Sequence, residues 1–433
     1  MSLTPSGYRS RLMEDKLKFY LEAFGAVEVR GPRWCGKTWM SLSVANSVTK
    51  LDDPAVRESV ELDARLALHG QTPHLVDEWQ EVPAVWDATR RAVDESAGDC
   101  GRFLLTGSSA PNMDKVAHSG AGRIARLRME PMTLFELGLS SGTVSLESLL
   151  CGDKVETAQS DLDFQDLVDA LCQGGWPAAI GKSKKYQSVI TKQYLDAFLD
   201  SVSSRSASDR DNLDSAYMRR ILYALARNDG GSASIDTLTR DAMNGEDFSS
   251  NDRATTNRYL SFVEENYMLR SLRGWDAPVK SRARTRTRPK RYLVDPSLTA
   301  SLLGYDAERL LLDRQLLGIL FENMCIRDLS VYLNASTSLQ DPQLFYYRDS
   351  YGLEVDVIIE TVAGKWAALE VKLDVAKADD AATNLLRLRD KVASNPLAQN
   401  PEPAFLGIIV ANAPYFFQRP DGVYVIPVGC LGR

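Results

Sequence analysis

The first residues whose types and spacing suggest chemistry lie between positions 31 and 38, where two glycines frame a short loop. The loop fits the pattern G-x-x-x-x-G-K-[ST] and consists of Gly31, Pro32, Arg33, Trp34, Cys35, Gly36, Lys37 and Thr38. Glycines let backbone N–H groups wrap around phosphates, and a following helix adds the positive end of its dipole. We therefore expect Lys37 to reach the β- and γ-phosphates of a nucleoside triphosphate and the Thr38 hydroxyl to bind Mg²⁺.

Two acids follow further along the chain, at the end of an apolar stretch. Asp77 and Glu78 come directly after His74-Leu75-Val76. Such a strand brings both acids to its C-terminal end, where α/β sheets bind ligands. We expect Asp77 to hold the metal through water and Glu78 to orient or deprotonate the attacking water. A solvated turn is the alternative interpretation of an acidic pair at a strand end.

Hydroxyl and arginine side chains beyond these acids are further candidates. The stretch Arg102–Ser109 reads as a strand that ends in hydroxyls, so Thr106 or Ser108 is expected to sense the γ-phosphate. A capping turn explains these hydroxyls nearly as well. Arg123, in a glycine-containing loop, is expected to stabilise transition-state charge, in cis or across a subunit boundary. A surface ion pair is the alternative for Arg123, and Arg126 is a competing candidate.

Near the end of the chain, two short strands joined by a turn carry a second group of acids. Asp356 lies in the first strand, and Glu370 and Lys372 lie two positions apart on the second, so those two side chains share a face. A hairpin brings Asp356 beside them, which supplies two carboxylates for a hard cation and a lysine to activate water. Glu322, in a helical stretch, is a further candidate ligand. Hairpins of this kind are common without catalysis, so a site that does not cleave is the alternative.

A basic stretch lies in a chain whose formal net charge is −7. It places a cation at every even position, namely Lys280, Arg282, Arg284, Arg286, Arg288 and Lys290. If the stretch is an extended strand, these cations share one face and repel one another, unless a polyanion supplies the opposite charge. We expect DNA phosphates to be that polyanion, with strongly salt-dependent binding. A solvated charged loop is the alternative.

The phosphate loop and the first two acids require a sheet of parallel strands. A strand over 26–29 leads into the loop, and a helix over 37–48 follows it. Further strands are expected over 74–76 and 102–106, with helices between them. Strands separated by helices predict a parallel sheet covered on both faces.

The rest of the chain reads first as helical and then as mixed. The region 160–204 is helical and ends in a serine-rich stretch, and three helical patterns precede the basic stretch at 217–227, 235–243 and 252–266. From about 314 onward a helix is followed by three strands over 344–348, 354–359 and 367–372. One more helix over 381–393 and two further strands over 404–410 and 422–426 complete this part. This order predicts a further α/β unit at the end of the chain.

The overall composition limits the class of protein. At 433 residues the chain is too long for one hydrophobic core, and 44% hydrophobic with 25% charged residues is typical of a globular protein. No apolar run approaches the ~18–20 residues that a membrane span needs. The N-terminus lacks the apolar stretch of a secretory signal, and the six cysteines show no zinc spacing. We expect a cytoplasmic protein with reduced thiols and no membrane partner.

Several runs together resemble a family of bacterial and archaeal AAA-type P-loop ATPases with a C-terminal domain similar to restriction nucleases. The runs are GPRWCGKT, LVDEWQEVP, LLTGSSAP, SGAGRIARLRMEPMTLFELG, QGGWPAA, KRYLVDPSL, GILFEN, YYRDSYGLEVDVII and ALEVK. The resemblance implies an α/β fold: a P-loop NTPase sheet with a helical lid, then a winged helix-turn-helix and a nuclease-like α/β domain. It also suggests that copies of the chain assemble into a homo-oligomer.

These observations predict four domains and one main activity. The domains are a P-loop ATPase core at 1–140, a helical lid at 141–205, a winged-helix module at 206–298 and a nuclease-like domain at 299–433. We expect an enzyme that hydrolyses ATP with Mg²⁺ and engages DNA, coupling ATP turnover to a Mg²⁺-dependent nuclease-like domain. The alternative is an ATP-dependent switch or DNA remodeller whose nuclease-like domain binds DNA without cleaving it.

Overall fold

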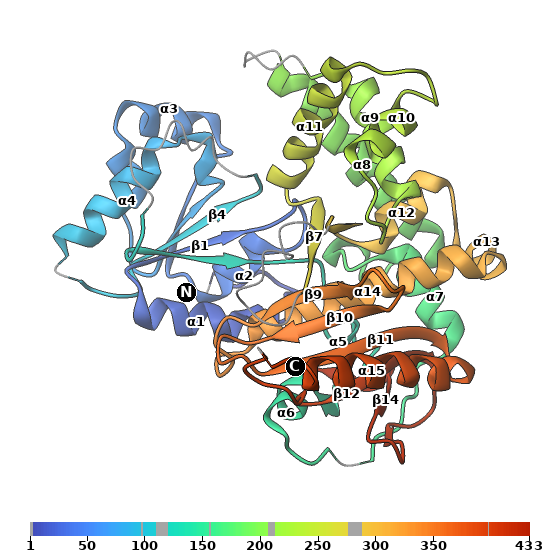
Figure 1. The fold of residues 1–433 in the computed structure, drawn as a ribbon. Coiled ribbons are helices and arrows are strands. Elements are labelled where there is room, and N and C mark those ends of the chain that lie inside the picture. Colours follow the sequence, from blue (N-terminus) through green and yellow to red (C-terminus); the bar gives the residue numbers. More distant parts are fainter. Residues whose placement is uncertain are drawn as a thin grey trace. The chain divides into compact units, whose positions relative to one another are not determined.

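The fold was analysed in a computed structural model, drawn in Figure 1. It describes residues 3–96, 98–109, 120–155, 157–206, 213–275, 288–396 and 398–433. The chain divides into two compact units, one of Met1–Pro131 with Glu265–Met268 and one of Met132–Glu264 with Leu269–Arg433. The boundaries expected at 140, 205 and 298 do not coincide with this division. Each unit is described by itself.

The first unit is built on a sheet of five parallel strands in the order β2-β3-β4-β1-β5 (Figure 1). The strands are β1 Ala26–Arg30, β2 Ser47–Lys50, β3 His74–Asp77, β4 Phe103–Gly107 and β5 Ile124–Arg128. The predicted parallel sheet is confirmed, but β2 and β5 were not predicted. The order places β4 between β1, which leads into the phosphate loop, and β3, which ends in the acids.

Helices cover both faces of this sheet. They are α1 Met13–Ala23, α2 Lys37–Val44, α3 Pro54–Leu62 and α4 Ala84–Glu95, with 3-10 turns η1 Ala64–Leu68 and η2 Trp79–Glu81. Phe103 and Leu105 of β4 join the hydrophobic core that α3, η1 and α4 close. Because side chains alternate along a strand, Leu104 points to the other face, where α1 and α2 pack. The helix expected to reach residue 48 ends at Val44, since Ser47 already pairs with His74 of β3.

The middle of the second unit is helical, as predicted. Its elements are α5 Leu134–Leu137, α6 Leu146–Cys151, α7 Phe164–Gln173, η4 Pro177–Ala179, α8 Lys184–Ser206, α9 Ser215–Arg227, α10 Ile235–Ala242, α11 Ser250–Glu265, α12 Pro296–Leu303 and α13 Ala307–Leu312. Several begin at a side chain that accepts a backbone N–H, such as Asp163, Asp214 and Asp295. Such caps stabilise a helix start because they satisfy amides that have no partner within the helix.

The same unit contains a mixed sheet of eight strands in the order β13-β14-β12-β11-β10-β9-β7-β8. Its strands are β7 Leu269–Gly274, β8 Lys290–Leu293, β9 Gln343–Arg348, β10 Glu354–Glu360, β11 Trp366–Asp374, β12 Leu406–Asn412, β13 Phe417–Gln418 and β14 Tyr424–Pro427. The other elements are α14 Arg314–Ala335, α15 Ala378–Ala393, η6 Val375–Lys377, η7 Val428–Cys430 and a two-stranded sheet of β6 Val144–Ser145 and β15 Leu431–Gly432. α15 packs on one face of the large sheet through Ala381, Leu385 and Leu388.

The eight-stranded sheet extends across the boundary that the sequence predicts at residue 298. β7 pairs with β8 on one side and, through Arg273 and Gly274, with β9 on the other. The strands on either side of the basic stretch therefore belong to the sheet of the C-terminal part. A boundary at residue 298 between two modules would divide one continuous sheet.

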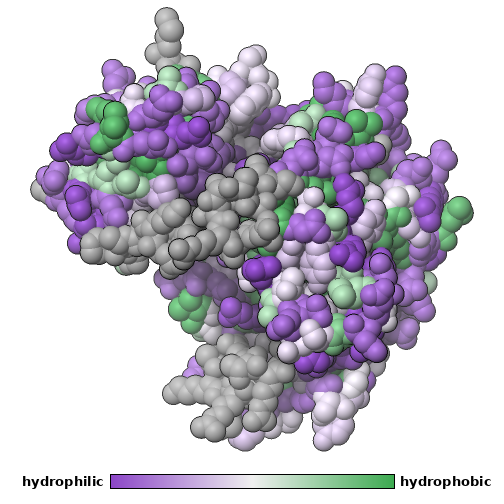
Figure 2. All heavy atoms as spheres, turned by 90° about the horizontal axis from the view of Figure 1, so that it is seen from above, coloured by the Kyte–Doolittle hydropathy of each residue, from purple (hydrophilic) through white to green (hydrophobic). Residues whose placement is uncertain are grey.

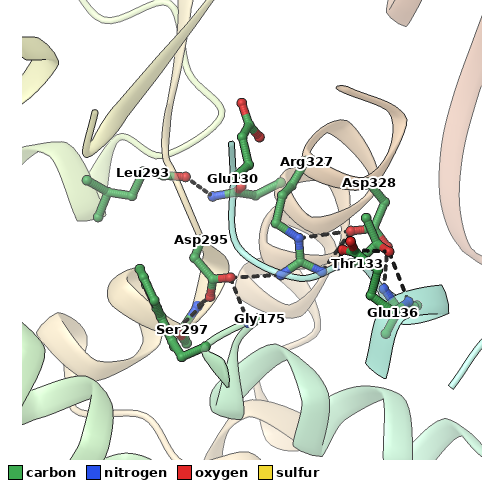
Figure 3. Close-up of polar contacts among 12 residues, drawn as sticks. Glu130, Thr133, Glu136, Gly175, Leu293, Asp295, Ser297, Arg327 and Asp328 are labelled. Atoms are coloured by element: carbon green, nitrogen blue, oxygen red, sulfur yellow. Dashed lines mark hydrogen bonds and ion pairs between the residues drawn. The ribbon is translucent and has the colours of Figure 1, made fainter. Parts of the chain in front are cut away.

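A buried group of three charged side chains joins distant segments of the second unit (Figure 3). Arg327 of α14 donates one hydrogen bond to Asp295 Oδ2 at 2.8 Å and another to Asp328 Oδ1 at 2.8 Å. All three side chains are almost completely buried. Both carboxylates face the same guanidinium, which compensates one of their two negative charges inside the protein.

Backbone amides from other segments complete this cluster, which we call the Arg327 cluster. Leu134 N donates to Asp328 Oδ2 at 2.9 Å. Gly175 N donates to Asp295 Oδ2 at 2.9 Å (Figure 3). The segments concerned include the runs QGGWPAA and KRYLVDPSL, whose individual roles no spacing rule had indicated. Their role in the structure is to bring α5, α7 and α12 onto α14.

No helix of the described part of the chain is both long enough and apolar enough to cross a membrane. On the face drawn in Figure 2, apolar side chains lie in small groups among hydrophilic ones. The large apolar side chains that are exposed include Trp34 of the phosphate loop and Trp39 of α2.

Replacing Arg327 by Met tests the Arg327 cluster. The substitution keeps most of the side-chain volume but leaves Asp295 and Asp328 without their cation, so we expect the unfolding free energy to fall by about 3–5 kcal/mol. Urea unfolding measures this change. Arg314→Met, at the exposed start of the same helix, is the control and should stay within about 0.5 kcal/mol of the native chain. Equal stability of the two variants would contradict the assignment.

Candidate functional site

The phosphate loop connects the end of β1 to the start of α2, as the sequence predicts. Gly31 and Gly36 have φ values of 155° and 101°, and Gly36 is the N-cap residue of α2. A Cβ on Gly31 would lie 2.1 Å from the carbonyl oxygen of Met129, so a side chain has no room there. Glycine thus allows the close backbone approach that shapes the loop at a helix N-terminus, where anions bind.

Lys37 is held by the loop itself. Its Nζ donates to the carbonyl oxygens of Gly31 at 3.0 Å and Pro32 at 2.8 Å, and the side chain is buried. Within the described ranges, Lys37 makes no ion pair with a carboxylate. A buried ammonium with neutral acceptors attracts a phosphate strongly, because little water screens the interaction.

Thr38 and Asp77 come from different elements but lie in direct contact. Thr38 Oγ1 donates to Asp77 Oδ1 at 2.8 Å, and Thr106 Oγ1 donates to the same carboxylate oxygen. Burial raises the pKa of Asp77, while the two hydroxyls act in the opposite direction. A buried carboxylate next to a hydroxyl provides the hard oxygen donors that Mg²⁺ prefers, so these residues fit the metal that the sequence predicts.

Glu78 follows in a left-handed backbone conformation, with φ 56°. Its Oε2 accepts hydrogen bonds from Ser108 Oγ at 2.9 Å and from Gln80 Nε2. Its backbone N–H donates to Thr106 Oγ1 at 3.2 Å. The two hydroxyls predicted to sense the γ-phosphate are therefore placed against the acidic pair. Gln80 was missed by the sequence reasoning, and its position two residues after Glu78 was the available signal.

Arg123 lies at the opposite end of the sheet from the phosphate loop. Its carbonyl accepts a hydrogen bond from the N–H of Ala26, the first residue of β1, whereas the loop follows Arg30, the last. Four residue steps along β1, from Ala26 to Arg30, separate these positions by about 13 Å. The guanidinium pairs with Asp94 at 2.8 Å on a half-exposed surface. This placement does not fit a role for Arg123 at the loop of its own chain, and it agrees with the surface ion pair considered as the alternative.

Arg126, the competing candidate, also has local partners. Its Nε lies 3.4 Å from Glu28 Oε2, and its guanidinium lies 5.4 Å from the centre of the Trp86 ring. Arg126 is in the middle of β5, level with Glu28 in the middle of β1. It therefore does not face the phosphate loop of its own chain either.

Asp356, Glu370 and Lys372 meet in the second unit, as the sequence predicts. Lys372 Nζ lies 3.2 Å from Asp356 Oδ2 and 2.5 Å from Glu370 Oε2. The N–H of Val371 donates to Asp356 Oδ2 at 2.9 Å. The adjacent strands β10 and β11 thus bring two carboxylates and one ammonium together. We call these three side chains the acidic site.

Lys290, predicted to contact DNA, instead points into the protein. Its side chain is 8% exposed and its Nζ lies 3.3 Å from Glu322 Oε1 and 2.8 Å from Glu354 Oε1. The Tyr292 hydroxyl also donates to Glu322, at 2.6 Å. The prediction for Lys290 was wrong, because an alternating pattern identifies which residues share a face but not which face is buried.

The remaining cations of the basic stretch give no further test. Lys280, Arg282, Arg284 and Arg286 lie outside the described residues. Arg288 lies within them, and its carbonyl oxygen accepts a hydrogen bond from the Tyr346 hydroxyl at 2.5 Å.

Negative charge is in excess around the acidic site. The four carboxylates of Glu322, Glu354, Asp356 and Glu370 outnumber by one the three cations that pair with them, Lys290, Lys372 and Arg348. Burial, followed by the charge of Asp356, raises the pKa of Glu370 to about 8 and that of Glu322 to about 7. Although burial opposes it, the charge of Lys372 holds the pKa of Asp356 below its usual value. The excess charge thus favours uptake of protons or of a cation.

The carboxylates fit a metal ion only in part. Among the described residues, no group of three or more His, Cys, Asp or Glu side chains is placed to hold one. Lys372 pairs with both predicted ligands, Asp356 and Glu370. Glu322 contacts Tyr292 and Lys290 instead. Glu370 Oε1 is buried and has no hydrogen-bond partner in the part of the chain that the structure describes. Asp356 and Glu370 therefore offer the two carboxylates that the sequence predicts and one open oxygen, while Glu322, the further candidate ligand, is held by other partners.

Comparison with protein-family models matches three parts of the chain. Residues 24–138 match a model described as an AAA domain. This stretch is therefore similar to AAA domains. Residues 164–309 match a domain of unknown function (DUF8612), and residues 317–431 match another (DUF4143). An AAA domain implies ATP binding, typically with Mg²⁺, in agreement with the loop and the acids described above. The nuclease-like character expected for the C-terminal part receives no support from these matches.

Two curated mycobacterial proteins are similar over most of the chain. Uncharacterized protein Rv2008c of Mycobacterium tuberculosis and uncharacterized protein Mb2031c of Mycobacterium bovis are each 26% identical over 365 residues. These stretches cover 82% of this chain and 72% of each relative. The similarity thus extends well beyond the AAA domain.

Similar solved structures include the Walker-type ATPase PABY2304 of Pyrococcus abyssi, which is 13% identical with a TM-score of 0.44. That alignment covers 70% of this chain and 99% of the other. The ORC1 protein of Aeropyrum pernix in complex with DNA is 12% identical, with a TM-score of 0.29, over 70% and 94% of the two chains. RuvB of Thermotoga maritima is 17% identical, with a TM-score of 0.29, over 71% and 99%. These TM-scores are too low to support an argument about this chain.

The raised pKa of Glu370 makes a prediction about stability and pH. The folded protein holds a proton on Glu370 up to about pH 8, whereas the unfolded chain releases it near pH 4.3. Stability is therefore lost as pH rises through this window. The unfolding free energy of the native chain should therefore fall between pH 5 and pH 9. In Glu370→Gln we expect this fall to be smaller by at least about 1.4 kcal/mol.

Urea unfolding at a series of pH values measures this difference. Glu402→Gln, at an exposed position of the same unit, is the control and should follow the native curve. Parallel curves for Glu370→Gln and the native chain would show that the carboxyl is not protonated in the folded state.

Proposed function

We propose that this chain hydrolyses ATP at the phosphate loop. The observation that carries the proposal is the 2.8 Å contact between Thr38 Oγ1 and Asp77 Oδ1. It brings the hydroxyl at the end of the loop against the acid at the end of β3, although 39 positions separate them in the sequence. The match of residues 24–138 to an AAA domain supports the same conclusion.

Each residue of the site then has a defined task. The backbone N–H groups of the loop and the Lys37 ammonium bind the phosphates. Thr38 and Asp77 would hold Mg²⁺, which neutralises charge on the phosphates when bound. Glu78 orients the attacking water, and Ser108 and Gln80 fix the direction of its carboxylate.

Two substitutions separate ATP binding from hydrolysis. Lys37→Met removes the buried cation and should weaken binding of a non-hydrolysable ATP analogue at least about tenfold, because a charged hydrogen bond contributes about 1.5–3 kcal/mol. Glu78→Gln keeps the shape and the hydrogen bonds but removes the base, so nucleotide binding should persist while kcat falls by about 10²–10⁴. Mg²⁺-dependent phosphate release and equilibrium binding of the analogue measure the two effects.

Glu81→Gln is the matched control, since Glu81 lies three residues beyond Glu78 and pairs with Arg57 on the surface. It should hydrolyse ATP at the native rate. Native turnover in Glu78→Gln would exclude the role assigned to Glu78, and native affinity in Lys37→Met would exclude the loop as the binding site.

As a second candidate function, we propose that the acidic site cleaves phosphodiester bonds of DNA. The observation that favours it is the convergence of Asp356, Glu370 and Lys372, with Glu370 Oε1 buried and open. A divalent cation held by the two carboxylates would supply Lewis-acid activation of a phosphate. The proposal that DNA is the substrate rests on the basic stretch that precedes β8.

We also propose that Arg123 acts in the ATP site of a neighbouring copy of the chain.

Incubation of plasmid DNA with the protein, ATP and Mg²⁺ or Mn²⁺ tests the second function. We expect cleavage by the native chain and a loss of at least about a hundredfold in Asp356→Asn and Glu370→Gln, as for removal of a metal-site or acid–base group. Glu402→Gln should cleave at the native rate. If the native chain cleaves no DNA under any of these conditions, the alternative applies, in which ATP turnover controls a part that binds without cleaving.

A further inference from the structure

Arg11 is a buried cation next to the phosphate loop that the sequence reasoning did not single out. It precedes α1 and is 4% exposed. Its Nη1 donates to the carbonyl oxygen of Cys35 at 2.6 Å, and its Nη2 donates to the carbonyl oxygen of Glu130 at 2.9 Å. One planar guanidinium therefore joins the loop to the segment that follows β5.

The first of these bonds fixes the orientation of a peptide in the loop. The peptide between Cys35 and Gly36 is planar and trans, so its C=O and its N–H point in opposite directions. Because Arg11 holds the carbonyl of Cys35, the N–H of Gly36 is directed away from Arg11. Gly36 is the N-cap residue of α2, where backbone N–H groups bind phosphates.

The second bond fixes the backbone behind the loop. Glu130 follows Met129, whose carbonyl oxygen lies 2.1 Å from where a Cβ of Gly31 would be and 3.9 Å from Cys35 Sγ. Arg11 thus binds both the loop and the segment that packs against it.

The charge of Arg11 also acts on the loop. Burial raises the pKa of the Cys35 thiol, and the positive charges of Lys37 and Arg11 oppose this effect. Both cations contribute a favourable potential for anions at the loop, and the nearby charge of Glu130 acts in the opposite direction. Arg11 donates these two bonds to carbonyl groups that carry no net charge.

We propose that Arg11 is a positioning residue of the ATP site: by holding the Cys35–Gly36 peptide, it prepares the loop to bind phosphates. The inference rests on the proposed function. Arg11 acts on the affinity for the triphosphate and not on the water-activating step, which belongs to Glu78 at the end of another strand. Its loss should raise the KM for ATP and leave kcat nearly unchanged.

Two variants and a control test the proposal. Arg11→Met keeps the length of the side chain but removes its charge and donors, and Arg11→Lys keeps the charge but cannot donate in parallel to two carbonyls. We expect KM, and Kd for a non-hydrolysable ATP analogue, to rise at least about tenfold in Arg11→Met and by a smaller factor in Arg11→Lys. In both, kcat should change less than about threefold. Arg9→Met, at an exposed position two residues earlier, should leave KM, Kd and kcat unchanged.

The outcomes separate this inference from the proposed function. Binding of the analogue requires no turnover, so a native chain that binds without hydrolysing refutes the ATPase proposal while the effect of Arg11→Met on Kd still decides the role of Arg11. Native Kd in Arg11→Met, or a fall in kcat at unchanged KM, overturns the positioning role. If neither Arg11 variant folds, Arg11 is required for the fold itself and the proposal is also overturned.

Discussion

The parallel pairing of β1 with β4 and β5 is the constraint on which the nucleotide site depends. Arg30 at the end of β1 is level with Gly107 in β4 and with Arg128 in β5. The phosphate loop, Ser108 and Met129 therefore leave the sheet side by side, and the acids that end β3 join them from beyond β4. The same alignment places Arg123 at the far end of the sheet. One register thus decides which residues form the site and which do not.

Two lysines show how the acceptors around a buried ammonium affect its availability. Lys37 is held by two neutral carbonyls of its own loop, so exchanging them for a phosphate gains an opposite charge. Lys372 is held by two carboxylates, and moving it would leave both without their cation. The nucleotide site is therefore ready to bind an anion. The acidic site must first reorganise its charges, by taking up protons or a cation, before it can act on a phosphate.

The sequence predicted best what depends on local spacing. The loop from Gly31 to Thr38, the acids after β3 and the meeting of Asp356 with Lys372 all follow from short motifs and the two-residue period of a strand. Contacts between distant segments were not predictable in this way. The N–H of Leu134 binds Asp328, which lies 194 positions further along the chain. Lys290 points inward because it pairs with Glu322 and Glu354, which come from later elements of the chain. Nothing in the local pattern shows that β7, before the boundary expected at residue 298, pairs with β9, which follows it.

The central claim is that the loop, Thr38 and Asp77 form one site for ATP and Mg²⁺. A crystal structure with Mg²⁺ and a non-hydrolysable ATP analogue tests it most directly. The account predicts that Lys37 leaves the carbonyls of Gly31 and Pro32 for the phosphates, and that Mg²⁺ lies at Thr38 with Asp77 beside it. A nucleotide bound elsewhere, with Lys37 still on those carbonyls, would contradict the account.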